Sequence, residues 1–209
     1  MRENEWIGPL RPVKDVPCRQ GWARFISGVV DMQKKTQIMD EAQVRRTIIR
    51  MAHEIIERDK GVSDVVLVGI RRRGEPIARM LAGAIKRVEG TQVPVGTVDI
   101  TFYRDDLTCV SRDPKLNHTD ISFSVEGRTV VLVDDVLYTG RTARSALDAL
   151  MDLGRANRIQ LAVLIDRGHR ELPIRADFVG KNVPTAQTEF VRVAVPDIDA
   201  ETGVWLCDR

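Results

Sequence analysis

The amino-acid sequence predicts an α/β protein with a doubly wound, mostly parallel β-sheet. Short uninterrupted apolar runs at residues 65–70, 129–133 and 159–165 are typical of strands that are buried on both faces. Segments with helical spacing of apolar residues follow the first two runs, at 75–88 and 141–153. Because strands and helices alternate along the chain, successive strands are expected to be parallel, with helices covering both faces of the sheet.

The N-terminal part of the chain divides into an extension and a first helix. Residues 1–39 contain three prolines and no sustained periodicity, so an irregular N-terminal extension is expected there. Asp40 and Gln43 have the spacing of a capping box, and apolar residues then recur at helical spacing. A helix is therefore expected from Asp40 to about Lys60, where Gly61 ends it.

A long polar connection separates the two halves of the predicted sheet. A strand is expected at 95–103, and residues 104–127 then lack any clear element. Loops of this length in compact domains are often functional. Ligands of doubly wound sheets bind at the carboxyl ends of the strands. Three loops should therefore converge there: residues 71–74, 134–142 and 166–170.

Composition restricts the class of protein. The chain has 209 residues, of which 43% are hydrophobic and 30% charged, as in a soluble protein, with one domain expected over residues 40–209. No stretch reaches the roughly 18 apolar residues that a membrane span requires, so a cytoplasmic protein is expected. The three cysteines are scattered, which predicts neither disulfides nor a zinc site. The net charge of +2 does not by itself indicate a nucleic-acid binder.

Residues 130–142 carry the most informative pattern, because a buried strand runs into two acidic residues and then a turn rich in hydroxyl side chains. Asp134 and Asp135 are costly to desolvate together, so they should face a polar cleft and accept hydrogen bonds from ribose hydroxyls. The following turn begins a helix, whose N-terminal N–H groups can bind a phosphate. The residues predicted to form this site are Asp134, Asp135, Val136, Leu137, Tyr138, Thr139, Gly140, Arg141 and Thr142.

A purely structural interpretation of the same segment is that two aspartates begin a turn and Thr139 caps a helix. The complete order of strand, acidic pair and hydroxyl-glycine turn favours the phosphate site. Walker and dinucleotide-binding glycine patterns are absent from the sequence. A glycosidase or two-metal site is disfavoured, because adjacent residues of a strand point to opposite faces.

This loop resembles the signature of the type I phosphoribosyltransferases, which bind 5-phosphoribosyl 1-pyrophosphate (PRPP) with a small hood over the base and a flexible lid loop. Segments 99–107, 133–142, 166–177 and 180–185 are more narrowly similar to the bifunctional pyrimidine operon attenuation regulators that are also uracil phosphoribosyltransferases. The resemblance extends from about residue 38 to the C-terminus. Residues 1–31 have no counterpart in it.

The resemblance implies that uracil and PRPP react to give UMP and pyrophosphate. Magnesium would be carried by the pyrophosphate near Asp134 and Asp135, with no metal ligated by the protein alone. The implied catalytic residues are Arg73, Arg104, Asp134 and Asp135. Arg72, Arg73 and Gly74 match the pyrophosphate loop, although the family usually has Thr where this chain has Arg72. Taken alone, the run of three arginines could also be a solvated basic turn.

Two further parts of the site are implied by the same resemblance. Residues 103–106 match the start of the lid, with Arg104 as its candidate residue, unless Arg104 forms only surface ion pairs. The nucleobase hood corresponds to Asp166, Arg167, Gly168 and His169.

The family's second activity is UMP-dependent binding of pyrimidine-operon leader mRNA. Arg46, Arg50 and His53 share one exposed helical face, which on its own is most often only a solvated surface. The resemblance adds that the RNA contacts would come from Arg50, His53, Arg58, His169, Arg170, Arg175 and Lys181. Some of these could instead brace the hood or a dimer interface.

Three interpretations stay open at this point. The chain is a UMP-responsive regulator that also makes UMP, a phosphoribosyltransferase for another nucleobase, or a regulator that has lost catalysis. The segment 166–177 favours the pyrimidine family over purine enzymes, and the intact loop 134–142 argues against lost catalysis. The resemblance also implies a homodimer, or a higher homo-oligomer built from it.

Overall fold

The computed structural model describes residues 34–100 and 119–208. Three helices and eight strands make up this part of the chain. In order, they are β1 (Lys34–Met39), α1 (Glu41–Asp59), β2 (Val65–Ile70), α2 (Gly74–Glu89), β3 (Val95–Val98), β4 (Thr129–Leu137), α3 (Arg141–Leu153), β5 (Arg158–Asp166), β6 (Phe178–Asn182), β7 (Glu189–Ala194) and β8 (Gly203–Asp208).

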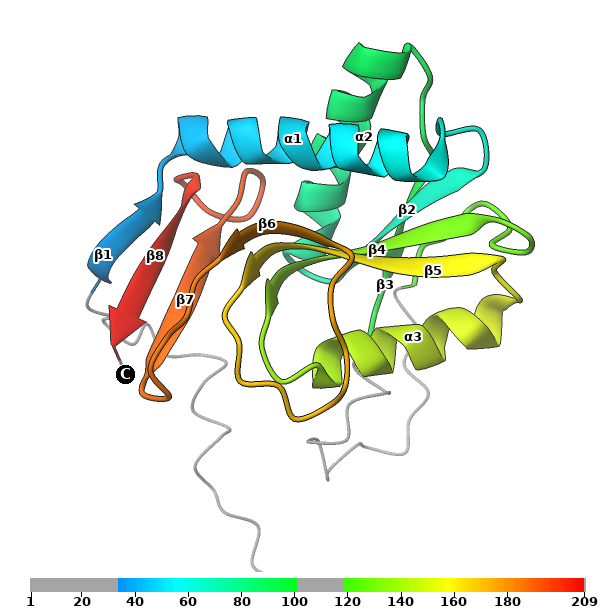
Figure 1. The fold of residues 1–209 in the computed structure, drawn as a ribbon. Coiled ribbons are helices and arrows are strands. Elements are labelled where there is room, and N and C mark those ends of the chain that lie inside the picture. The colour runs from blue at the N-terminus through cyan, green and yellow to red at the C-terminus, as the bar shows by residue number, and fades with distance from the viewer. Residues whose placement is uncertain (1–33, 101–118, 209) are drawn as a thin grey trace, which may run out of the picture. The chain divides into compact units, whose positions relative to one another are not determined.

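The central sheet confirms the predicted fold class. Five parallel strands lie in the order β3-β2-β4-β5-β6, with α1 and α2 on one face and α3 on the other (Figure 1). The order reverses between β2 and β4, so the carboxyl ends of these two strands form the crevice where doubly wound sheets bind ligands.

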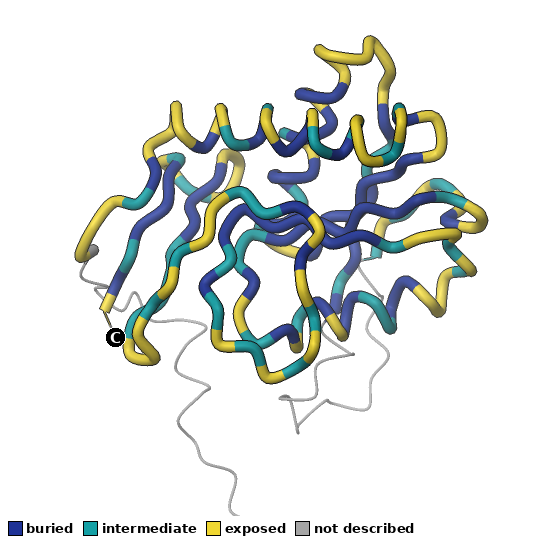
Figure 2. The backbone as a smooth tube through the Cα atoms, in the orientation of Figure 1, coloured by how far each residue is buried: buried dark blue, intermediate teal, exposed yellow. Residues whose placement is uncertain are grey.

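Alternating side chains of the central strands fill two apolar cores. Leu67 and Val131 pack with α1 and α2 on one face, whereas Val68 and Leu132 pack with α3 on the other. All six residues of β2 are buried, which explains why its sequence is continuously apolar and does not alternate (Figure 2).

A second, antiparallel sheet corrects the interpretation of the N-terminal segment. It has the order β1-β8-β7, and β1 pairs along β8, with Met39 opposite Val204. Residues 34–39 were expected to belong to an irregular extension, and this part of the prediction was wrong. Their strand character depends on pairing with residues near the C-terminus, and most of their described side chains are exposed, so local periodicity could not indicate it.

The boundaries of the three helices and of β2 and β5 follow the predictions closely, whereas β6, β7 and β8 were not predicted. Asp40 accepts the N–H of Gln43, and the Gln43 side chain accepts the N–H of Asp40, so the capping box of α1 is confirmed. β4 extends through Leu137, which places both aspartates of the predicted site inside the strand. β3 is described as far as Val98, and residues 101–103 of the predicted strand lie outside the described residues. No helix within residues 34–100 and 119–208 is long and apolar enough to cross a membrane.

Candidate active site

A cleft of about 540 Å³ opens at the carboxyl edge of the central sheet. It is bounded by the loop after β2, the end of β3, and the end of β4 with the start of α3. The residues that line it are Ile70, Arg71, Arg72, Arg73, Asp99, Ile100, Asp134, Asp135, Val136 and Thr142. Two of the three predicted loops therefore meet in one cleft, and the third, residues 166–170, lines a neighbouring hollow.

Asp134 and Asp135 are the acidic groups that the end of β4 brings to this cleft. Asp134 is 8% exposed, and its Oδ1 accepts the N–H of Asp135 at 2.9 Å. Burial raises the pKa of Asp134 well above its usual range, and the adjacent charge of Asp135 raises it further. Burial also raises the pKa of Asp135, whereas the charge of Arg73 lowers it. Such a pair can accept hydrogen bonds from sugar hydroxyls, and their raised pKa values are typical of functional sites.

The turn after β4 ends in a glycine immediately before α3. Gly140 is the N-cap, and its φ of 93° is a backbone conformation that residues other than glycine rarely adopt. Because the N-cap is a glycine, no N-cap side chain accepts the N–H groups of the first turn of α3. These N–H groups can therefore bind an anion. The Thr139 hydroxyl lies 3.4 Å from the N–H of Arg141, so Thr139 borders this site although Gly140 is the cap. A Cβ at Gly140 would also contact Leu172 and Ile174 at 3.4 Å.

The arginine run between β2 and α2 forms the opposite wall of the cleft. Arg72 is exposed, and a cis peptide joins it to Arg71. Arg73 turns toward the loop between β7 and β8, where its Nη2 lies 3.2 Å from Asp199 Oδ1. Gly74 begins α2 directly against β4, because a Cβ there would lie 2.2 Å from the carbonyl oxygen of Val133. The loop therefore requires glycine at this position.

The predicted hood forms a separate hollow of about 370 Å³. Arg167 is buried, with its guanidinium carbon 4.0 Å from the centre of the Tyr138 ring. It also donates to the Glu189 carbonyl at 2.7 Å. His169 Nε2 lies 2.7 Å from the carbonyl oxygen of Thr185. The lining residues of this hollow are Asp166, Arg167, Gly168, His169, Asn182, Pro184 and Thr185.

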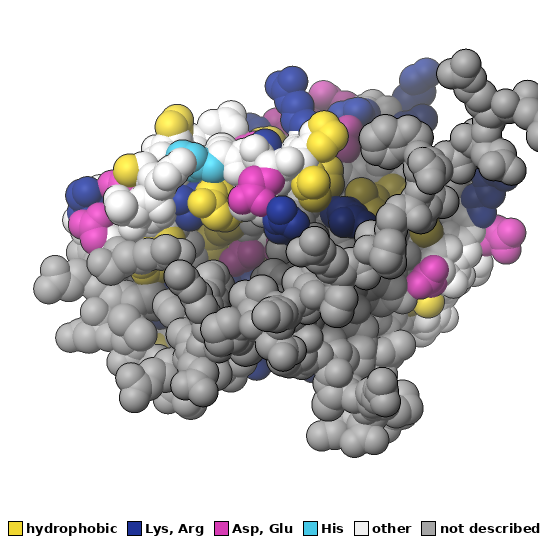
Figure 3. Space-filling view, turned by 90° about the horizontal axis from the view of Figure 1, so that it is seen from below, with side chains coloured by type: hydrophobic (Ala, Val, Ile, Leu, Met, Phe, Trp, Pro, Cys, Tyr) yellow, Lys and Arg dark blue, Asp and Glu magenta, His cyan; other side chains and the backbone are white. Residues whose placement is uncertain are grey.

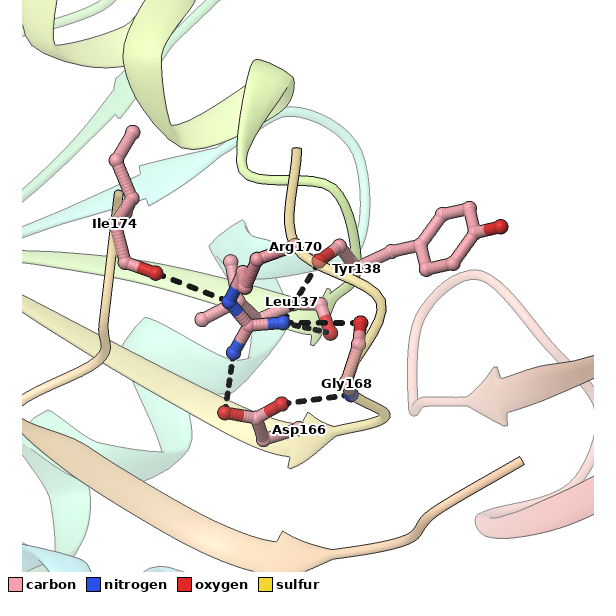
Figure 4. A network of polar contacts seen from close by, with 6 residues as sticks. All are labelled: Leu137, Tyr138, Asp166, Gly168, Arg170 and Ile174. Atoms are coloured by element: carbon pink, nitrogen blue, oxygen red, sulfur yellow. Dashed lines mark hydrogen bonds and ion pairs between the residues drawn. The ribbon is translucent and has the colours of Figure 1, made fainter. Parts of the chain in front are cut away.

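Arg170 fastens the hood to the phosphate loop (Figure 4). Its guanidinium pairs with Asp166 and donates to four backbone carbonyls, those of Leu137 at 3.4 Å, Tyr138 at 2.7 Å, Gly168 at 3.1 Å and Ile174 at 3.0 Å. The resemblance implied a contact with RNA for this residue. In the structure its guanidinium braces the hood, a role that the sequence left open, and its contact with RNA stays a prediction.

The other basic residues implied in RNA binding are spread over several parts of the described structure. Arg50 of α1 and Lys181 of β6 share a groove of about 270 Å³, which is also lined by Arg46. Arg58 lies farther along α1, where it pairs with Asp177 at 2.7 Å and stacks on Phe178. His53 and Arg175 are exposed. On the face seen in Figure 3, described acidic and basic side chains are interspersed, so the groove on α1 is the clearer candidate for an anion-binding surface.

Sequence reasoning missed Asp99 and Asp199. Asp99 belongs to segment 99–107, which is similar to the family, but no role in the site was predicted for it, and it lines the cleft. Asp199 belongs to no motif, and its contact with Arg73 spans 126 positions, so no local signal could have identified it. Arg104 lies outside the described residues, and its role in the lid stays a prediction.

The donor set of the cleft suits a magnesium ion that arrives with substrate. Mg²⁺ commonly keeps several waters and is bound by one or two carboxylates together with substrate phosphates. Asp134 and Asp135 supply such carboxylates. Within the described ranges, no group of three or more His, Cys, Asp or Glu side chains is placed to hold a metal. The two carboxylates fit an ion that is also bound by substrate phosphates.

Comparison with solved structures supports the fold. The chain is similar to a hypoxanthine phosphoribosyltransferase of Trypanosoma cruzi, with a TM-score of 0.65 at 20% identity, over 84% of this chain and 97% of that one. A hypoxanthine phosphoribosyltransferase of Staphylococcus aureus gives a TM-score of 0.63 at 20% identity, over 84% and 92% of the two chains. At these identities the likeness concerns the fold alone.

Sequence comparison identifies the family. Residues 34–198 match the model of the phosphoribosyl transferase domain. The chain is 63% identical over 172 residues to the "Bifunctional protein PyrR" of Pelotomaculum thermopropionicum, which covers 82% of this chain and 95% of the relative. It is 57% identical over 178 residues to the protein of that name from Thermus thermophilus, over 85% and 98% of the two chains. This chain therefore belongs to the phosphoribosyl transferase domain family and, within it, to the bifunctional PyrR proteins.

Proposed function

We propose that this protein transfers the phosphoribosyl group of PRPP to uracil, giving UMP and pyrophosphate. One observation carries the proposal: Asp134 and Asp135, the start of α3 and the arginines before α2 line one cleft at the switch point of the sheet. These are the three groups that a ribose, its 5-phosphate and its pyrophosphate require.

The chemistry assigned to each group follows from its charge. The N-terminus of α3 binds the 5-phosphate, and Asp134 and Asp135 accept hydrogen bonds from the ribose hydroxyls. A bond forms between uracil N1 and C1′ while the bond from C1′ to the pyrophosphate oxygen breaks, and the N1 proton is released. The carboxylates stabilise the positive charge that develops on the sugar, and Arg73 stabilises the departing anion. Bound Mg²⁺ would supply further positive charge to the pyrophosphate.

Arg72 changes the pyrophosphate loop relative to the family pattern. Its exposed guanidinium lines the same cleft as Arg73, so the loop carries an additional positive charge where Thr is usual. We expect this charge to strengthen binding of pyrophosphate and to slow its release, because the anion leaves a more positive site.

We further propose that the protein binds pyrimidine-operon leader RNA in response to UMP and so controls transcription attenuation. Support comes from the groove that Arg46, Arg50 and Lys181 line, since adjacent cations on one surface suit phosphate contacts. Arg170 links the phosphate loop to the hood, which offers a physical route from bound UMP to the rest of the molecule. His53, Arg58, His169 and Arg175 remain candidates for the same surface.

Uracil-dependent consumption of PRPP tests the enzymatic half. The purified protein should consume PRPP with uracil and release UMP, with much slower turnover on hypoxanthine, guanine or cytosine. Asp135→Asn should lower kcat/KM by roughly 100-fold or more, the order expected when a group stabilising the transition state is lost. Asp64→Asn is the matched control, because Asp64 is exposed just before β2, at the opposite edge of the sheet. Equal turnover with a purine would favour an enzyme for another base.

Filter binding tests the regulatory half. The protein should retain its pyrimidine-operon leader RNA more tightly with UMP than without it, and the affinity should fall steeply with salt. Arg46→Ala and Lys181→Ala should weaken binding, whereas Arg87→Ala should not, since Arg87 is exposed on α2 outside the groove. Turnover without RNA binding would leave a salvage enzyme, and UMP-dependent binding without turnover would leave a regulator that has lost catalysis.

Three finer features are proposed, the first two on the family resemblance and the third on the sequence pattern. The protein works in the cytoplasm, it forms a homodimer, and its phosphoribosyltransferase domain follows an N-terminal extension. Light scattering during size exclusion would measure the oligomeric state directly. Deleting residues 1–31 should leave uracil turnover unchanged, and an unchanged RNA affinity on deletion would show that this segment takes no part in RNA binding.

A further inference from the structure

Asp199 is a partly buried acidic residue that contacts the pyrophosphate loop from a distant part of the chain. It lies in the connection between β7 and β8, with its side chain 10% exposed. Its two carboxylate oxygens lie 3.2 Å and 3.4 Å from Nη2 of Arg73. The small antiparallel sheet thus reaches the proposed catalytic cleft through one ion pair.

The carboxylate of Asp199 is itself held in place. Its Oδ2 accepts the N–H of Val195 at 3.1 Å, and its own N–H donates to the Val195 carbonyl at 3.0 Å. Arg192 Nη2 adds a second cation 3.8 Å from Oδ1. Because backbone bonds fix this side chain to the end of β7, it can fix the guanidinium that it pairs with.

Arg73 lies between two sources of negative charge. On the cleft side it lowers the pKa of Asp135, and on the other side it pairs with Asp199. Without Asp199, attraction to Asp135 would draw the guanidinium toward the ribose carboxylates. Arg73 has five N–H donors, of which Asp199 engages those on Nη2. Its buried Nε has no partner among the described residues.

We propose that Asp199 is a positioning residue that holds the Arg73 guanidinium on the pyrophosphate side of the cleft. The proposal rests on the proposed phosphoribosyl transfer and deepens it. With one nitrogen held by Asp199, the remaining N–H donors of the Arg73 guanidinium are already oriented toward an anion. Less side-chain conformational entropy is then lost when PRPP binds. Asp199 itself touches no reacting atom and acts only through Arg73.

Electrostatics and positioning predict opposite results, which makes the proposal testable. If Asp199 only neutralised charge, its removal would leave Arg73 more available and tighten the binding of pyrophosphate. If it positions Arg73, Asp199→Asn should lower the affinity for PRPP and for magnesium pyrophosphate on the order of tenfold. This is the effect expected when one long side chain is no longer held in place. UMP, which has no pyrophosphate, should bind as in the wild type.

Calorimetric titration with PRPP, magnesium pyrophosphate and UMP gives these affinities. Asp197→Asn is the matched control, because it makes the same chemical change two residues away at an exposed position. Asn also tolerates the positive φ of 73° found at Asp197. This control should bind all three ligands like the wild type. In the Arg73→Ala background, Asp199→Asn should have no further effect on PRPP affinity.

Several outcomes would overturn the proposal. Tighter pyrophosphate binding by Asp199→Asn would identify simple charge neutralisation, and equal losses for UMP and PRPP would identify a general structural role. Should Asp199→Asn not fold, Arg73→Lys removes the fork while leaving Asp199 intact, and an unchanged PRPP affinity there would refute the idea. A wild-type protein that binds no PRPP would refute the proposed function itself, whereas normal wild-type binding with an unaffected Asp199→Asn would refute only this inference.

Discussion

Replacing Asp134 with Asn should stabilise the protein while abolishing its activity. The carboxylate of Asp134 is 8% exposed and lies beside a second acidic residue. An ionised carboxylate can accept about four hydrogen bonds. Among the described residues, the N–H of Asp135 donates to Asp134 Oδ1 at 2.9 Å. The side-chain oxygen of Asn can accept the same hydrogen bond. Removing the under-solvated charge should raise the free energy of unfolding at pH 8 by about 1–3 kcal/mol.

The pH dependence separates this mechanism from better packing. The pKa of Asp134 is about 3.8 in the unfolded chain and is raised in the folded protein, mainly by burial. Between these two values the folded state binds more protons than the unfolded state, so the wild type loses stability as pH rises. Asn does not titrate. The advantage of Asp134→Asn should therefore grow as pH rises from about 4 and level off above the folded pKa.

Urea denaturation at pH 5, 6.5 and 8 measures this difference. In a thermal denaturation experiment, a gain of 1 kcal/mol in the free energy of unfolding near Tm would raise Tm by roughly 2–4 °C for a chain of this size. Asp64→Asn is the control and should show no growing difference with pH, because Asp64 is exposed. A variant that is less stable than the wild type at pH 8, or equally stabilised at pH 5 and pH 8, would refute the reasoning. Asp134→Asn should lose uracil turnover whether or not it is more stable, because the charge that destabilises the folded protein is the one that the reaction uses.

Three further substitutions test the packing around the cleft. Gly74→Ala should lower the free energy of unfolding by about 1–3 kcal/mol or more and impair PRPP binding, because its Cβ would lie 2.2 Å from the Val133 carbonyl oxygen. Gly83→Ala, in the same helix with no atom within 4 Å of the added Cβ, should instead raise stability by about 0.5–1 kcal/mol; thermal denaturation compares the two. Arg170→Met should cost about 1–3 kcal/mol and weaken UMP binding, because Asp166 loses its partner and the hood its anchor. Unchanged UMP affinity in Arg170→Met would show that the anchor is not required.

The sequence by itself predicted those features that depend on neighbouring residues. β2, β4 and β5 are recognisable because strands buried on both faces must be continuously apolar. The capping box of α1 requires two residues three positions apart. The phosphate loop is one contiguous segment, because a helix N-terminus and the strand before it bring its parts together locally.

Features that depend on distant partners required the tertiary structure. β1 is a strand because β8, near the other end of the chain, supplies its hydrogen bonds. Arg170 looks like a surface cation in the sequence, yet backbone carbonyls from two separate loops surround its guanidinium. No pattern could distinguish this residue from Lys181, which lines the basic groove.

The sequence alone therefore determined the fold class, the position of the acidic pair and the phosphate loop, and the resemblance to the family. The tertiary structure decided where the charges of the cleft point. Asp199 contacts Arg73 across 126 positions, and Asp134 acquires its raised pKa from the burial that the packed sheet imposes. Both effects arise from desolvation and long-range proximity, which exist only when the chain is folded.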